Sequence, residues 1–116
     1  IIGDVSFFGL GCEIPRYCQA AWNESMTEQA AHSLLTKTEA YDVLVTHTPP
    51  KGHVDVEHDD DHQGGHDGSA SILRAIEERQ PHFHFCGHMH DSWGQLSQVG
   101  QTRIYNLGPT LNWFDI

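Results

Sequence analysis

Basic residues are scarce in this chain. Lys and Arg together number 6 against 16 Asp and Glu, so the formal net charge is −10 with histidine neutral. Such a chain lacks the basic patch that nucleic-acid-binding proteins use, and anionic lipid would repel it. We therefore expect neither nucleic acid nor a membrane surface as a partner. An anionic substrate would need a bound cation to recruit it.

Cysteines and long apolar runs are also few. Cys12, Cys18 and Cys86 are odd in number and form no Cys-x-x-Cys pair. They predict neither a disulfide framework nor a structural zinc knuckle, and they favour a reducing, cytoplasmic location. No apolar run approaches the ~18 residues of a membrane span, and no signal-peptide pattern occurs. Apolar residues make up 38% of the chain, and its three tryptophans and clear apolar runs favour a folded domain.

The chain does not begin with Met but starts inside an apolar segment. We therefore expect a fragment or a processed chain. Its 116 residues suffice for one domain with a modest core, so we treat 1–116 as a single, partial domain.

Strand and helix patterns alternate along the chain. Strands are predicted at 4–11, 41–47 and 82–88, helices at 26–40 and 69–80, a hairpin at 94–109, and a last strand at 112–116. A capping box at Ser25–Glu28 predicts the start of the first helix, and Ser69 is the expected N-cap of the second. Pro81 ends the second helix, and the hairpin turns at 99–101. This order predicts an α/β fold with parallel strand pairing.

Two histidines are expected at one edge of this sheet. His47 and His88 each follow an apolar strand, and the carboxyl ends of parallel strands share an edge. His88 also belongs to a Gly-His-x-His motif with His90, in which Gly87 would let the backbone approach closely. Neutral imidazole is a common metal ligand, so the pattern predicts a metal site.

The remaining histidines have simpler interpretations. His82 and His84 alternate with phenylalanines and are expected on an exposed or edge-strand face, and His32 on a solvated helix surface. Residues 48–67 form a long acidic, histidine-rich loop without periodicity. Its histidines His53, His58, His62 and His66 indicate either a lid or weak metal site, or a solvated loop.

Several segments together resemble the C-terminal half of calcineurin-like metallophosphoesterases. They are DVLVTHTPPKG, GSASILRAIEERQPHFHFCGHMHDSWG and TRIYNLGP, preceded by FFGLGCEIP. The resemblance covers nearly the whole chain. It implies the C-terminal half of a four-layer α/β/β/α sandwich with mixed sheets.

The resemblance also implies a site with two divalent metal ions, drawn from manganese, iron, zinc or nickel. His47 and His88 would bind the second metal and His90 the first. Asp55 and His66 match positions near the substrate, a phosphomonoester or phosphodiester. Asn106-Leu-Gly-Pro109 would form a structural turn.

The motifs of the family's first half are absent from this chain. Asp-x-His, Gly-Asp-x-x-Asp and Gly-Asn-His-Asp/Glu do not occur in context, since the Asp60–His62 match lies in the polar loop. The general acid would therefore lie outside this chain. We expect the chain to be inactive alone, with the N-terminal half of its own domain as partner, or to associate through exposed sheet edges.

Three alternatives stay open at this stage. A His-rich metal-binding or metal-sensing module explains the ten histidines, and a degenerate half-domain explains the missing motifs. A metallo-β-lactamase-type hydrolase fits less well, because Asp91 stands one place early and no histidine follows it.

Overall fold

The computed structural model describes residues 2–14, 25–56 and 65–116, and these form an α/β unit. The elements in chain order are β1 (Phe7–Leu10), α1 (Glu28–Lys37), β2 (Val43–Thr46), α2 (Ala70–Arg79), β3 (Phe83–Cys86), the 3₁₀ turn η1 (His90–Ser92), β4 (Leu96–Val99) and β5 (Thr102–Asn106). Among the described residues, the helices are too short and too polar to cross a membrane.

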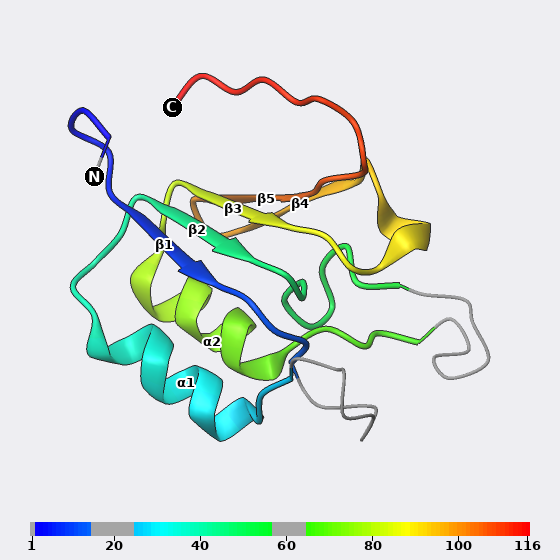
Figure 1. The fold of residues 1–116 in the computed structure, drawn as a ribbon, viewed down its shortest axis with the longest axis horizontal. Helices are drawn as coiled ribbons and strands as arrows, with labels where there is room; N and C mark the ends of the chain where they lie inside the picture. Colours follow the sequence, from blue (N-terminus) through cyan, green and yellow to red (C-terminus); the bar gives the residue numbers. More distant parts are fainter. Residues whose placement is uncertain (1, 15–24, 57–64) are drawn as a thin grey trace.

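A five-stranded mixed sheet forms the centre, in the order β1-β2-β3-β5-β4. β1, β2, β3 and β5 run parallel, and β4 pairs antiparallel with β5. The predicted parallel pairing and the hairpin are thus confirmed. The carboxyl ends of four strands consequently meet at one edge (Figure 1).

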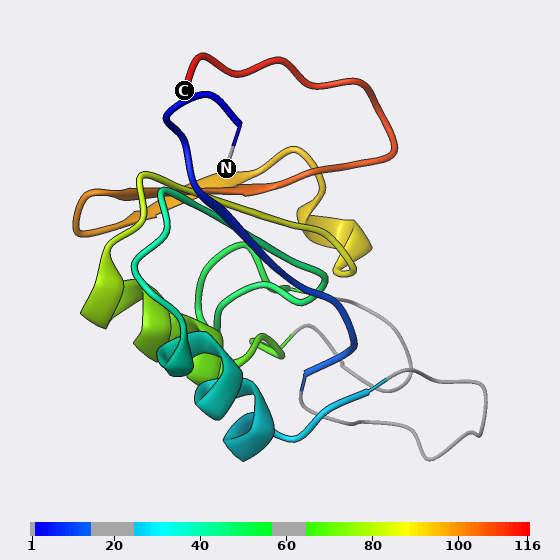
Figure 2. The ribbon, with the colours of Figure 1, turned by 60° about the vertical axis from the view of Figure 1, so that its left-hand side comes forward.

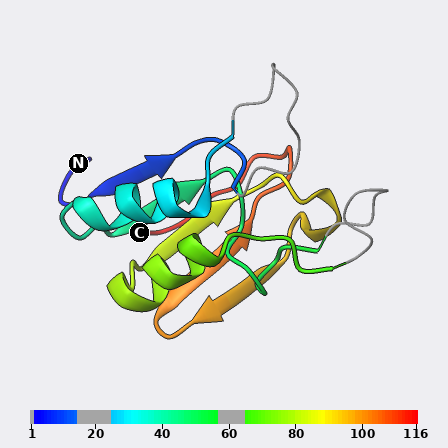
Figure 3. The same cartoon turned by 90° about the horizontal axis from the view of Figure 1, so that it is seen from below.

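Both helices cover the same face of the sheet (Figures 2 and 3). The core lies between the sheet and the two helices. Alternate residues of each strand point toward the helices, and one apolar stripe of each helix points toward the sheet. Its buried apolar residues are Leu10, Ile14, Ala31, Leu35, Tyr41, Leu44, Val54, Ile72, Ala75, Ile76, Cys86 and Ile104. The sequence-based fold class, α/β, is confirmed at this level.

The helix starts differ in how well they were predicted. Ser69 caps α2 as expected, since its side chain accepts a hydrogen bond from the Ile72 N–H. For α1 the predicted capping box at Ser25 was wrong. Thr27 is the N-cap instead, accepting from the Ala30 N–H, and the helix ends at Lys37 rather than near residue 40. Ser and Thr both satisfy the first free N–H groups, so the sequence Ser-Met-Thr offered two starts.

The predicted last strand is also wrong. Residues 111–116 have no regular structure, and the segment lies across the sheet face opposite the helices (Figure 1). Phe114 packs there on Phe85 and Tyr105, with ring centroids 4.6 and 4.8 Å away. Aromatic packing on the face thus replaces edge pairing for this segment.

Much of that second face stays open. Phe7 and Val45 point to it and are 42% and 41% exposed, and Trp113 in the covering segment is 85% exposed. Buried α/β sheets normally have both faces covered. This face is therefore apolar and only partly covered within the described residues.

His84 contradicts the expectation of an exposed strand face. β3 is a central strand, and His84 is fully buried on the helix-facing side, whereas His82 is exposed as expected. Thr46 Oγ1 donates to the Thr48 carbonyl at 2.6 Å, so it must accept from the Nε2–H of His84, 2.8 Å away. The helices cover the side of β3 that carries His84, whereas the phenylalanines point to the other face. The alternation His-Phe-His-Phe therefore does not identify a solvent side.

Burial lowers the pKa of His84 to about 3, below its ordinary 6.5. Between these pH values the unfolded chain binds a proton that the folded chain does not, so stability falls as pH drops from 6.5 toward 3. His84→Gln retains an amide donor but cannot titrate. Urea unfolding of the full-length protein from pH 7 to 4 should show the wild type losing up to about 1.4 kcal/mol per pH unit relative to the variant. Parallel stability curves would contradict this assignment.

Candidate functional site

The carboxyl edge of the sheet brings three chain segments together. β1 continues into the turn that carries Glu13, β2 into His47, and β3 into His88. Backbone bonds extend the strand register past the strand ends: the His47 N–H donates to the Leu10 carbonyl, and the Gly87 N–H to the His47 carbonyl. The positions of these side chains are therefore set by the parallel sheet itself.

His47 and His88 lie in direct contact at this edge. Nε2 of His47 is 2.9 Å from Nδ1 of His88, and the ring centroids are 4.5 Å apart. The prediction that both histidines lie at one edge of the sheet is confirmed by this geometry. His47 is exposed and His88 half-buried, so the pair is open to solvent on one side.

The spacing of the two nitrogens fits a shared metal ion. Ligand nitrogens lie ~2.0–2.1 Å from such ions, so neighbouring ligands on one ion are separated by about 2.9 Å in octahedral and about 3.4 Å in tetrahedral geometry. The observed 2.9 Å is an ordinary hydrogen-bond distance between two ring nitrogens, and it also equals the octahedral separation. Nδ1 of His88 and Nε2 of His47 are thus the two atoms that would hold a cation.

His90, the third predicted ligand, does not join the contact between His47 and His88. It lies on η1, is exposed, and packs its ring against Trp93 at 4.3 Å. Within residues 2–14, 25–56 and 65–116, no three His, Cys, Asp or Glu side chains are arranged to hold one metal ion. The structure therefore brings together a pair of the predicted ligands.

Gly87 does not have the role expected of it. A Cβ at Gly87 would meet the Leu107 carbonyl oxygen only at 3.7 Å, an ordinary contact. The unusual backbone lies at His88 instead, whose φ is +65°. The Met89 N–H donates to the Gly87 carbonyl at 2.7 Å, which closes a tight three-residue turn around His88.

Backbone strain gathers around this edge. Four non-glycine residues of the described chain have positive φ, and three of them are Cys12, Val54 and His88, at +77°, +51° and +65°. Cys12 precedes Glu13, Val54 precedes Asp55, and His88 belongs to the histidine pair. Such conformations cost about 1–3 kcal/mol each and cluster at functional sites, because the surrounding structure must enforce them.

Asp55 and His66, the predicted substrate residues, form a hydrogen-bonded pair. Nδ1 of His66 is 2.6 Å from Oδ1 of Asp55, and the other Asp55 oxygen accepts from the N–H groups of Gly52 and Gly68. Asp55 is fully buried, whereas the His66 side chain is 59% exposed. His66 alone therefore presents a surface to solvent, and Asp55 orients it.

The loop around Asp55 is anchored beside the metal-ligand candidates. Ser92 Oγ accepts from the Val56 N–H and donates to the Val56 carbonyl, which ties the loop to η1. Burial, and to a smaller extent the charge of Asp55, raises the pKa of the Cys86 thiol at the end of β3. A Cβ at Gly68 would lie 2.6 Å from the Pro50 carbonyl oxygen, so the two loop ends pack too closely for any other residue.

Other loop histidines give a mixed result. His53 is half-buried and lies 2.7 Å from Ser97 Oγ through its Nδ1, so it is held rather than solvated. His58 and His62, and with them the Asp60–His62 match, lie outside the described residues.

Asn106, at the end of β5, links the Asp55 loop to the turn around His88. Its buried amide donates to the Val54 carbonyl at 2.8 Å and approaches the Met89 and Gly87 carbonyls at 3.3 and 3.4 Å. The structural interpretation of this turn is supported, and the side chain links the Asp55 loop to the His88 turn.

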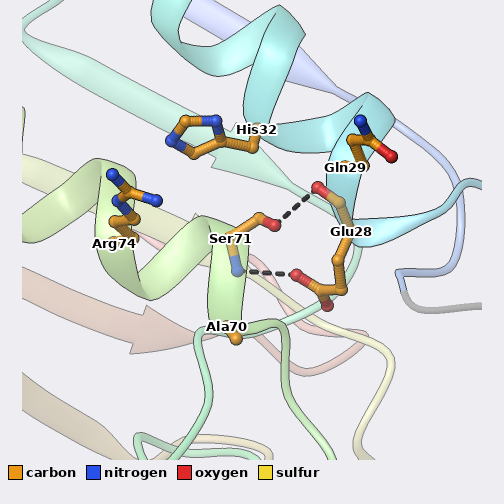
Figure 4. A pocket seen from close by; sticks show the side chains of 6 residues that line it. All are labelled: Glu28, Gln29, His32, Ala70, Ser71 and Arg74. Atoms are coloured by element: carbon orange, nitrogen blue, oxygen red, sulfur yellow. Dashed lines mark hydrogen bonds between the residues drawn. The ribbon is translucent and has the colours of Figure 1, made fainter.

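A hollow of about 340 Å³ lies elsewhere, between α1 and α2 (Figure 4). It is lined by Glu28, Gln29, His32, Ala70, Ser71 and Arg74, and none of the candidate site residues. Glu28 accepts from the Ser71 N–H at 2.6 Å and from Ser69 Oγ at 2.9 Å, so it joins the two helices. His32 is half-buried beside this hollow rather than solvated.

Sequence reasoning missed Glu13. Its Oε1 lies 3.5 Å from Nε2 of His88, and its side chain is only 12% exposed. The signal was available: Glu13 follows a strand by three residues, and the carboxyl ends of parallel strands collect the polar groups of a site.

Comparison with known proteins finds relatives whose name states no activity. Three UPF0046 proteins of Caenorhabditis elegans are 41%, 34% and 32% identical to this chain over 66, 103 and 93 residues. These matches cover 56%, 89% and 79% of this chain but 23%, 33% and 22% of the relatives. No protein-family model matches the chain. The chain is thus similar to about a third or less of each of these longer proteins.

Proposed function

We propose that this chain is the ligand-bearing half of a metal-dependent phosphoesterase, which hydrolyses phosphomonoesters or phosphodiesters at two divalent metal ions. The supporting observation is the contact of His47 Nε2 with His88 Nδ1, 2.9 Å apart at the carboxyl edge of a parallel sheet. That spacing and the imidazole donor set fit manganese, iron, zinc or nickel.

Electrostatics agree with this proposal. A phosphoester is anionic, and the chain carries a net charge of −10. When bound, two divalent ions would activate water and neutralise charge on the phosphoryl oxygens. His47 and His88 would hold one ion through the nitrogens that now face each other. His90 would hold the second, together with ligands from outside this chain.

His66 has the geometry of a substrate-facing residue. The buried Asp55 carboxylate accepts a hydrogen bond from the Nδ1–H of His66, which leaves Nε2 as the acceptor nitrogen of a side chain that is 59% exposed. The Nε2 atom of His66 would then bind a phosphate oxygen of the substrate or hold a proton for that oxygen. Asp55 would act only through His66, because it has no exposed surface of its own.

The N-terminal half of the same domain is the proposed partner. The chain spans a third or less of the relatives it matches, and the second sheet face exposes Phe7 and Val45. A second sheet packed on this face would complete a four-layer sandwich and bury the apolar surface.

The isolated chain should therefore be marginally stable. We expect it to self-associate, or to unfold without a cooperative transition, because an exposed apolar face and open strand edges favour association. Analytical ultracentrifugation and thermal circular dichroism of residues 1–116 check this. A pure monomer that unfolds cooperatively well above room temperature would contradict the proposed partner.

Hydrolysis by the full-length protein tests the function. A chromogenic bis-phosphodiester and a phosphomonoester should each be assayed with and without added manganese. Hydrolysis that requires manganese is expected, and the ester preferred would narrow the substrate class. A well-folded protein that binds several ions loosely and hydrolyses neither ester would favour the metal-buffering or sensing alternative.

A further inference from the structure

The two ring nitrogens of His88 face different groups. Nδ1 lies 2.9 Å from His47, whereas Nε2 lies 3.5 Å from the Glu13 carboxylate. The 3.5 Å between Nε2 and the Glu13 oxygen is within ion-pair range but longer than an ordinary N–H···O hydrogen bond. The imidazole therefore stands between a candidate metal position and a carboxylate.

The backbone around Glu13 is firmly placed. Ile14 is fully buried, and its N–H donates to Thr48 Oγ1 at 2.9 Å. The Glu13 carbonyl accepts from the Met26 N–H at 2.9 Å, and Cys12 before it has a φ of +77°. The first bond ties the turn after β1 to the segment after β2, and the second ties it to the segment before α1. The Glu13 backbone is thus fixed at the edge where its carboxylate meets His88.

A carboxylate beside one nitrogen decides which nitrogen of a neutral imidazole carries the proton. The carboxylate is an acceptor only, so it favours the proton on the nitrogen that faces it. Here that nitrogen is Nε2, and Nδ1 is left with its lone pair toward His47. Metal-binding histidines commonly donate their second N–H to such a carboxylate, which fixes the tautomer and makes the ligand more basic.

We propose that Glu13 is a positioning residue of the metal site: it holds the His88 proton on Nε2 and thereby makes Nδ1 the metal ligand. This inference rests on the proposed metal-dependent function and adds a residue that binds neither metal nor substrate directly. The strained backbone at Cys12 and His88 fits this role, because it sets the two side chains against each other.

Zinc binding to the full-length protein tests the inference without any activity measurement. Isothermal titration should show Glu13→Ala weakening zinc affinity by roughly 10–100-fold. Glu13→Gln should lose less zinc affinity, because its amide oxygen can still accept a hydrogen bond from the Nε2–H of His88. Glu77→Ala is the matched control: Glu77 is an exposed glutamate on α2 and should leave affinity unchanged.

Nitrogen-15 NMR of labelled histidines in the zinc-loaded protein gives a second readout. In the zinc-loaded wild type, His88 should show a protonated Nε2 and a zinc-bound Nδ1. In the zinc-free protein, the shape-conserving variant Glu13→Gln should show a smaller fraction of His88 protonated at Nε2 than the wild type does. Zinc bound at Nε2, or directly at Glu13, would overturn the inference. So would Glu13→Ala binding zinc like the wild type while His88→Ala does not bind. A wild type that binds no zinc would instead overturn the proposed function.

Discussion

Replacing His88 with Ala should abolish the manganese-dependent hydrolysis of phosphoesters that we propose for the full-length protein. His88 would supply one of the two nitrogens at 2.9 Å that hold the cation. Loss of an outer-shell partner of a metal ligand already costs ~10–100-fold, so loss of the ligand itself should reduce kcat/KM by more than about 100-fold. Steady-state assays at several manganese concentrations measure this.

The fold should survive the same substitution. Ala and His are both L residues at the positive φ of position 88, so the backbone strain is nearly unchanged. His82→Ala is a suitable control, since His82 is exposed at the start of β3 and away from the pair. Equal activity of His88→Ala and His82→Ala, with both proteins folded, would contradict the assignment of His88.

Replacing Asn106 with Ala should destabilise the protein by about 1–3 kcal/mol. The Asn106 side chain is buried, with the residue 1% exposed, and its amide serves the carbonyls of Val54, Gly87 and Met89. Without it the Val54 carbonyl loses this donor, which costs about 1–3 kcal/mol for a buried group. The Gly87 and Met89 carbonyls still accept from the N–H groups of Met89 and Ser92. Urea unfolding of the full-length protein measures the change.

Asn112→Ala provides the matched control for Asn106. Asn112 is exposed and bonds only the nearby Thr110 carbonyl, so its loss should change stability by less than about 0.5 kcal/mol. Because Asn106 joins the Asp55 loop to the His88 turn, Asn106→Ala should also weaken metal binding. Similar stability of the two variants would show that the amide does not hold these loops.

The order of the elements up to the hairpin, and the place of His47 and His88 at one edge of the sheet, could be predicted from the sequence. The reason is physical: strand and helix periods are local, and right-handed parallel connections place strand ends together. Neither step needs knowledge of side-chain packing. The hairpin was predictable for the same reason, since Val99 and Thr102 flank a Gly100 with a φ of +58°.

Features set by long-range packing could not be predicted from the sequence. The burial of His84 depends on β3 lying at the centre of the sheet, between β2 and β5. The loss of the last strand depends on Phe114 finding aromatic partners on the sheet face. Its position after β1 could have placed Glu13 at the same edge, but its contact with the distant His88 became visible only once the strands were placed.

A crystal of the full-length protein grown with manganese would test the central claim most directly. Anomalous diffraction should show an ion within ~2.0–2.2 Å of both His47 Nε2 and His88 Nδ1, and a second ion near His90, ~3.5–4 Å from the first. An ordered structure with no anomalous peak at the histidine pair, or with peaks only along the acidic loop at residues 48–67, would contradict it.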